Sequence, residues 1–138
     1  MYTQSFAVLA FLGLSLAGSA PAGSGKEVTR KSESTFACNL DAFTPAERKR
    51  HFDELSPMLR ARKTAIRELP DGYEFKFPSD KETFDLVAEW AQQEARCCPF
   101  FRIEVVLREE GGPLWLRLAG RKGTKEFIRD DFAPWFNK

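Results

Sequence analysis

The sequence predicts an α+β fold: a four-stranded, mainly antiparallel sheet made of two hairpins, with three helices in the order α-ββ-α-ββ-α. Two segments alternate apolar and charged residues on either side of turn sequences, which is typical of hairpins. A long segment between them, and shorter ones before and after, carry apolar residues at helical spacing. Since helices alternate with hairpins, we expect the helices to cover one face of the sheet.

The first helix is predicted to begin at a capping box, with Thr44 as N-cap, Pro45 in the first helical position and Glu47 three residues after the cap. Pro57 interrupts the apolar spacing that follows. Because proline cannot donate a helical hydrogen bond, we expect a kink or restart near Ser56.

The first hairpin is predicted around Pro70-Asp71-Gly72, whose residues supply the turn dihedrals. Alternation after the turn predicts that Phe75 and Phe77 are buried, while Glu74 and Lys76 stay exposed.

A long helix is predicted next, beginning at a capping box over 79–82. Its buried face is expected to contain residues spaced by three or four: Phe84, Val87, Ala88, Ala91, Ala95 and Cys98. Pro99 ends this helix, because the residue before proline avoids the helical region.

The second hairpin is predicted over 101–118 and turns at 109–113. The sheet face away from the helices is expected to be mainly polar. A final helix follows Gly120, and we read Thr124 as its N-cap, with the 120–125 loop as a turn rather than an anion site.

Residues 1–22 form a leader without charged side chains, and their apolar run of 13 residues (6–18) is shorter than the roughly 20 needed for a membrane span. Ala20-Pro21-Ala22 offers a cleavage site of the signal-peptide type. We expect a signal peptide and export to the periplasm or the medium, with an N-terminal membrane anchor as the alternative. Residues 23–35 are predicted to be a flexible linker, and 36–138 a single α+β domain.

Composition excludes several classes of function. The net charge of +1 argues against a nucleic-acid partner that is bound through a basic surface. The chain has one histidine, so a metal site with several histidines is excluded, and we read His51, within a charged stretch, as solvated. No stable membrane span is expected.

The cysteines are the sharpest functional signal. Cys97 and Cys98 are adjacent at the predicted end of the long helix, and Cys38 precedes the first helix. Soft thiolates select soft ions, so three sulfurs suit Zn(II), Cu(I), Hg(II) or arsenite. Zinc would require a fourth ligand, for which His51 or a carboxylate is the candidate. Arg96 and Arg102 flank the pair and favour thiolates, whereas the helix C-terminus opposes them.

Core packing, disulfide formation and redox chemistry are alternatives to metal binding for the cysteines. Free cysteine is often buried, and Cys98 lies on the apolar stripe while Cys97 lies on another edge, so the two are not expected to be equally buried in the same core. In an exported protein Cys38 could also form a disulfide with either one. In the redox alternative, Cys97 attacks and a second cysteine resolves.

The combination of an early cysteine, Leu69-Pro70-Asp71-Gly72-Tyr73 and Arg96-Cys97-Cys98-Pro99-Phe100 resembles a group of small bacterial proteins to which no firm activity is assigned. The resemblance covers about residues 36–132 and implies no catalytic residues.

The sequence therefore favours a small exported protein that binds a soft metal or metalloid ion through Cys97, Cys98 and Cys38. We favour a binding protein over an enzyme and predict no catalytic residue. The alternatives are a thiol-redox protein and a structural or interaction module. The partner is expected to be the ion or a small ligand, and no oligomeric state is indicated.

Overall fold

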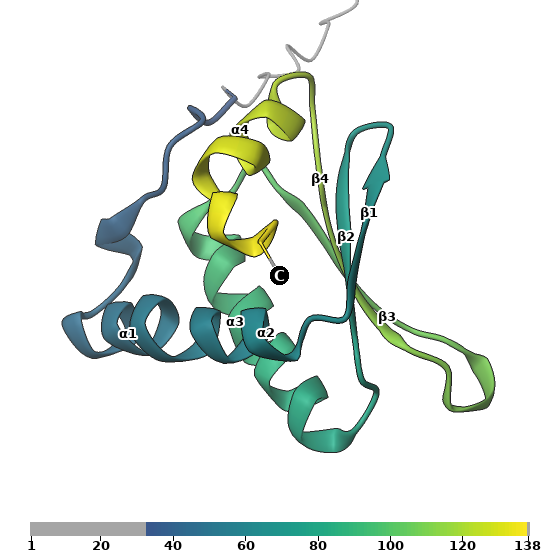
Figure 1. Cartoon of the computed structure of the whole chain (residues 1–138). Helices are drawn as coiled ribbons and strands as arrows, with labels where there is room; N and C mark the ends of the chain where they lie inside the picture. The colour runs from purple at the N-terminus through teal and green to yellow at the C-terminus, as the bar shows by residue number, and fades with distance from the viewer. Residues whose placement is uncertain (1–32, 138) are drawn as a thin grey trace, which may run out of the picture. The chain divides into compact units, whose positions relative to one another are not determined.

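The helices form a layer against one face of a four-stranded antiparallel sheet in the computed structural model, which describes residues 33–137 (Figure 1). The predicted fold class and element order are confirmed. The elements are η1 (Leu40–Ala42), α1 (Pro45–Lys49), η2 (Arg50–Leu55), α2 (Ser56–Arg62), β1 (Ala65–Leu69), β2 (Gly72–Phe77), α3 (Lys81–Cys97), β3 (Arg102–Leu107), η3 (Glu109–Gly111), β4 (Leu114–Ala119), α4 (Thr124–Asp131) and η4 (Ala133–Trp135).

The two hairpins join through their second strands, which gives the strand order β1-β2-β4-β3. One row of side chains faces the helices across all four strands: Ile66 lies opposite Phe75, Phe75 opposite Leu116, and Leu116 opposite Val105. Phe75 and Phe77 are buried, as predicted. The helices complete this core with large apolar residues: Leu55, Leu59, Val87, Trp90, Ile128 and Trp135.

The other face of the sheet carries a row of alternating charges. Arg67 lies opposite Glu74, Glu74 opposite Arg117, and Arg117 opposite Glu104. Glu74 was expected to be exposed, but its side chain has 0% exposure because it lies between the two arginine side chains. Burial alone would raise the pKa of Glu74, but hydrogen bonds from Arg117 and Arg67 outweigh it and lower the pKa.

The first helical region is one continuous path through α1, η2 and α2. Its capping box is confirmed: Thr44 Oγ1 accepts from the Glu47 N–H at 3.2 Å, and Glu47 Oε2 accepts from the Thr44 N–H at 2.9 Å. A new helix, α2, begins at Ser56, in line with the predicted restart. Before it the chain widens into the π-helix η2, where the Ser56 N–H donates to the His51 carbonyl five residues earlier. This wider turn accommodates Pro57 in the first turn of α2.

The N-cap of α3 is Asp80, one residue later than the predicted box begins, and its side chain accepts from the Thr83 N–H. The buried stripe of α3 is also displaced from the predicted one. Ala95 is exposed, whereas Leu86, Trp90, Gln93 and Glu94 are buried. The displacement follows size, because burying Leu86 and Trp90 removes more apolar area from water than burying alanines does.

Helix α4 begins at Thr124, the residue that was predicted as its N-cap, so the true N-cap lies one residue earlier. Gly123 is its N-cap, with a φ of 98° that favours glycine, and Thr124 is fully buried inside the first turn.

None of the helices within residues 33–137 has the length and apolar content that crossing a membrane requires. The predicted leader and most of the predicted linker lie outside the described residues, so these boundaries stay predictions.

Candidate metal centre

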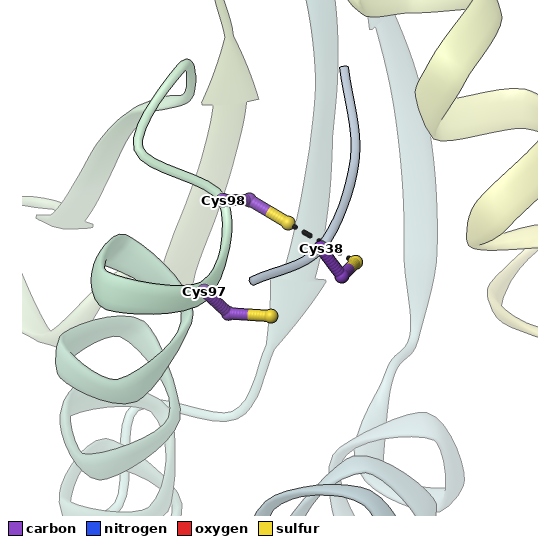
Figure 2. A group of neighbouring side chains, drawn as sticks. All are labelled: Cys38, Cys97 and Cys98. Atoms are coloured by element: carbon purple, nitrogen blue, oxygen red, sulfur yellow. Dashed lines mark hydrogen bonds between the residues drawn. The ribbon is translucent and has the colours of Figure 1, made fainter. Parts of the chain in front are cut away.

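The three cysteine sulfurs converge, although Cys38 lies 60 residues from Cys98 in the sequence. All three Sγ atoms lie within 4.8 Å of one another, and the Cys38 and Cys98 Sγ atoms are 3.4 Å apart. Figure 2 shows Cys97 and Cys98 at the end of α3, both pointing toward the separate segment that carries Cys38. The predicted ligand residues therefore form one group.

The end of α3 explains how two adjacent cysteines can share a site. Cys98 is the C-cap, and its φ of −117° and ψ of 73° leave the helical region before Pro99. Helical spacing no longer applies at this residue. The prediction that Cys97 and Cys98 would differ in burial is therefore wrong: both have 0% exposure and pack in one apolar cluster with Phe43 and Phe100.

The segment that carries Cys38 is held against the end of α3 by several contacts. The Asn39 N–H donates to the Cys97 carbonyl at 2.9 Å, which satisfies one of the free carbonyls at the helix end. The Phe36 ring packs edge-on against Phe100, with ring centroids 5.0 Å apart. Arg96 donates to Glu47 at 3.0 Å and thereby ties α3 to the start of α1.

The pKa values of the three cysteines are shifted in different directions. Hydrogen bonding from Cys38 and then Cys98 lowers the pKa of Cys97 to about 4, so this sulfur is a thiolate at neutral pH. Hydrogen bonding with Cys38 and Cys97, together with burial, raises the pKa of Cys98. The pKa of Cys38 is also raised, chiefly by its hydrogen bond with Cys97. These directions favour a thiolate at Cys97 and protons on Cys38 and Cys98.

The flanking arginines have a different role from the predicted one. Arg102 donates to Asp71 at 2.6 Å and to Glu104 at 3.1 Å, and Arg96 donates to Glu47. Their charges are engaged by carboxylates, and the hydrogen bonds among the sulfurs account for the thiolate at Cys97.

Asp131 was not predicted to belong to the site. Its Oδ2 accepts from the Cys38 thiol at 3.3 Å. Burial, followed by the hydrogen bond with Cys38, raises the pKa of Asp131 to about 6. No pattern in the sequence marks this residue, because the contact depends on how α4 packs beside the Cys38 segment.

His51 was predicted to be solvated, and this is wrong: it is 1% exposed. Its Nε2 lies 2.8 Å from Glu94 Oε2, and its Nδ1 lies 3.1 Å from Gln93 Oε1. The wide turn of η2 accommodates the ring between α3 and the ring of Phe43. The helical spacing of Trp90, Glu94 and Cys97 could have marked Glu94 as an inward-facing carboxylate.

The donor set determines what the site can bind. Among the described residues, the group of candidate ligand atoms within 4.8 Å of one another contains the three sulfurs alone, and His51 is not one of them. Three sulfurs around one ion, with bonds of about 2.3 Å, would stand about 4 Å apart in a trigonal arrangement. The observed separations are close to this, so one ion could bind to all three sulfurs after small side-chain movements.

No protein-family model, no curated protein and no solved structure matches the chain. The site is therefore interpreted from its own geometry, and the resemblance to the group of small bacterial proteins stays a prediction.

Proposed function

We propose that this protein binds a soft metal or metalloid ion with Cys38, Cys97 and Cys98. The observation that carries the proposal is the convergence of three sulfurs from two segments within 4.8 Å. Soft thiolate ligands select thiophilic ions. Within residues 33–137 no further candidate ligand joins the three sulfurs, which favours three-coordinate Cu(I), Hg(II) or arsenite over structural zinc.

The preformed geometry supports capture. Cys97 and Cys98 are held by one helix end, so the second bond costs little further ordering entropy. Cys38 is half-buried, whereas the other two sulfurs are fully buried. An incoming ion therefore meets Cys38 first, and the segment around Cys38 has to shift for the ion to reach the inner sulfurs.

The test is titration of the reduced protein with Hg(II), Cu(I), Zn(II) and arsenite, with bound ions counted by native mass spectrometry. We expect one ion per chain, and tighter binding of Hg(II), Cu(I) and arsenite than of Zn(II). Cys97→Ser and Cys98→Ser should abolish tight binding, and Cys38→Ser should weaken it. Ala37→Ser is the matched control, because it changes the same segment and leaves three thiols. If the cysteine variants bind like the parent, the proposal is wrong.

The distance of 3.4 Å between the Cys38 and Cys98 sulfurs favours a second function, reversible disulfide formation. A bond between them would close a loop worth about 4 kcal/mol in the chain-entropy model. The neighbouring Cys97 thiolate could then attack the Cys38 sulfur, which forms a Cys38–Cys97 disulfide and releases Cys98 as the thiolate, and an external dithiol would restore the reduced state. A mass lower by two hydrogens after mild oxidation, restored by a dithiol, would support this function.

We also propose that the protein acts outside the cytoplasm, on the basis of the apolar leader in residues 6–18 and the Ala20-Pro21-Ala22 sequence. Fractionation of cells that produce the full chain tests this. Recovery of the protein from the cytoplasm with Met1 still present would contradict it.

A further inference from the structure

A cavity of about 170 Å³ lies beside the thiol cluster. Its volume is close to that of an engineered protein cavity that holds benzene. Cys38 and Asp131 border it on the side of the cluster. Its lining includes the exposed Phe52 and five buried residues: His51, Trp90, Glu94, Phe132 and Trp135.

Glu94 presents an unused acceptor in this cavity. The residue is 2% exposed, and its Oε2 already pairs with His51 at 2.8 Å. Within residues 33–137, Glu94 Oε1 has no hydrogen-bond partner, although the carboxylate also acts on the neighbouring Cys98 thiol and helps to raise its pKa. Leaving a buried carboxylate oxygen without a donor is costly, so this atom favours a ligand that brings an N–H or O–H group.

A positive charge lines the same cavity. Arg60 is half-buried there and, among the described residues, forms no ion pair. The indole of Trp90 supplies an aromatic surface, which attracts an organic ammonium group. The lining thus combines a buried carboxylate, a guanidinium group, an aromatic surface and the Cys38 thiol. Together these groups are complementary to a small zwitterion that carries a sulfur atom.

We infer that the cavity binds a thiol of amino-acid size, which brings the soft ion to the cluster as its thiolate complex. The ammonium group of the thiol donates to Glu94 Oε1, its carboxylate pairs with Arg60, and its sulfur lies toward Cys38. This inference rests on the proposed function, because it names the form in which the ion arrives.

The transfer is a ligand exchange without oxidation or reduction. The Cys38 sulfur forms a bond to the ion, and one bond between the ion and the incoming thiolate breaks. The proton of the Cys38 thiol leaves with the departing sulfur as a free thiol. A second exchange, with the Cys98 thiol, forms a bond between that sulfur and the ion, and the Cys98 proton leaves on the other small thiol. The intermediate therefore contains the protein, the ion and one small thiol.

The experiment presents the reduced full chain with Hg(II) complexes of three thiols: cysteine, cysteamine without the carboxylate, and 3-mercaptopropionate without the ammonium group. Native mass spectrometry detects the adduct of protein, Hg(II) and one thiol, and competition gives relative affinities. We expect the cysteine adduct to be favoured at least about tenfold over either analogue, the scale of one lost hydrogen bond to a charged group.

Two variants assign the contacts. Arg60→Gln should remove the preference for cysteine over cysteamine, and Glu94→Gln should reduce the preference for cysteine over 3-mercaptopropionate. Arg60→Gln should not change the number of Hg(II) ions bound to the cysteines. Arg108→Gln, at an exposed residue beyond β3, is the control. Arg60 is only half-buried, so Arg60→Gln keeps the inference testable if Glu94→Gln does not fold.

The outcomes separate the two proposals. If Hg(II) binds once per chain but all three thiols form adducts equally, the cavity inference is wrong and ion capture stands. If both variants keep the parent's preference for cysteine, the inference is also wrong. If the parent binds no Hg(II) from any complex or as the free salt, both proposals are wrong.

Discussion

His51 Nε2 lies 2.8 Å from Glu94 Oε2, and both side chains are buried, at 1% and 3% exposure. The pair joins the π-helix η2 to α3, one turn before the cysteines. His51 Nδ1 lies 3.1 Å from Gln93 Oε1, so each ring nitrogen has an oxygen partner on α3. This contact fixes the position of the helix end that carries Cys97 and Cys98.

Removal of one partner of this pair should be costly. Glu94→Ala leaves the buried imidazole without its acceptor, and we expect a loss of about 3–5 kcal/mol in the free energy of unfolding. Glu109→Ala, at an exposed carboxylate in the turn between β3 and β4, should change it by less than about 0.5 kcal/mol. Urea melts followed by circular dichroism measure both. A loss below about 1 kcal/mol for Glu94→Ala would show that the pair contributes little.

The number of protons released or taken up when an ion binds should show that one of the three cysteines is already a thiolate. Because the pKa of Cys97 is lowered to about 4 while those of Cys38 and Cys98 are raised, the cluster carries two protons at pH 7. Binding of Hg(II) to three thiolates should release about two protons when the ion is supplied as its chloride complex in a chloride buffer, which keeps it free of hydroxide. Arsenite loses three hydroxide groups as water, so its binding should take up about one proton.

Calorimetry in buffers with different ionisation enthalpies measures this proton exchange. For the same reason, the affinity for the chloride complex of Hg(II) should rise with pH between about pH 5 and 8, with a slope of about two in logarithmic units. Release of three protons with Hg(II), and no uptake with arsenite, would mean that Cys97 is protonated at pH 7.

The ionisation of Glu74 should make the free energy of unfolding depend on pH in the acidic range. Arg117 and Arg67 hold the pKa of Glu74 below its ordinary value despite burial. Its folded-state pKa is therefore lower than its unfolded value of about 4.3, so its contribution is complete above that value and is lost as pH falls through the folded pKa.

The variant Glu74→Gln isolates this contribution. We expect it to lower the unfolding free energy by about 1–3 kcal/mol at pH 7, and the difference from the parent should shrink between about pH 5 and pH 2. Glu104→Gln, at the half-exposed end of the same row, should cost less. Parallel stability curves for parent and Glu74→Gln at all these pH values would contradict the assignment.

Substitutions at two neighbouring residues of β2 test which face of the sheet each side chain occupies. Phe75 has 0% exposure and packs against Trp135, with ring centroids 5.3 Å apart, so Phe75→Ala should cost about 3–5 kcal/mol. Lys76, the next residue, points to the other face, and Lys76→Ala should cost less than about 0.5 kcal/mol. Denaturant melts that show equal losses would mean that the strand faces are exchanged.

The sequence by itself determined the features that depend on neighbours along the chain. Alternation on both sides of Pro70-Asp71-Gly72 predicted the first hairpin, Thr44 and Glu47 predicted the first helix start, and Pro99 predicted the end of α3. Such signals act over about four residues, because turn dihedrals, helix caps and side-chain alternation are local properties.

Only the tertiary structure decided which distant groups meet. Cys38 reaches Cys98 because Asn39 and Phe36 dock on the end of α3, and Asp131 reaches Cys38 because α4 packs there. His51 looks solvated within its charged stretch, and its burial requires the wide turn of η2 and the acceptor Glu94. Contacts across 43 to 93 residues depend on how whole elements pack, and local spacing carries no information about that.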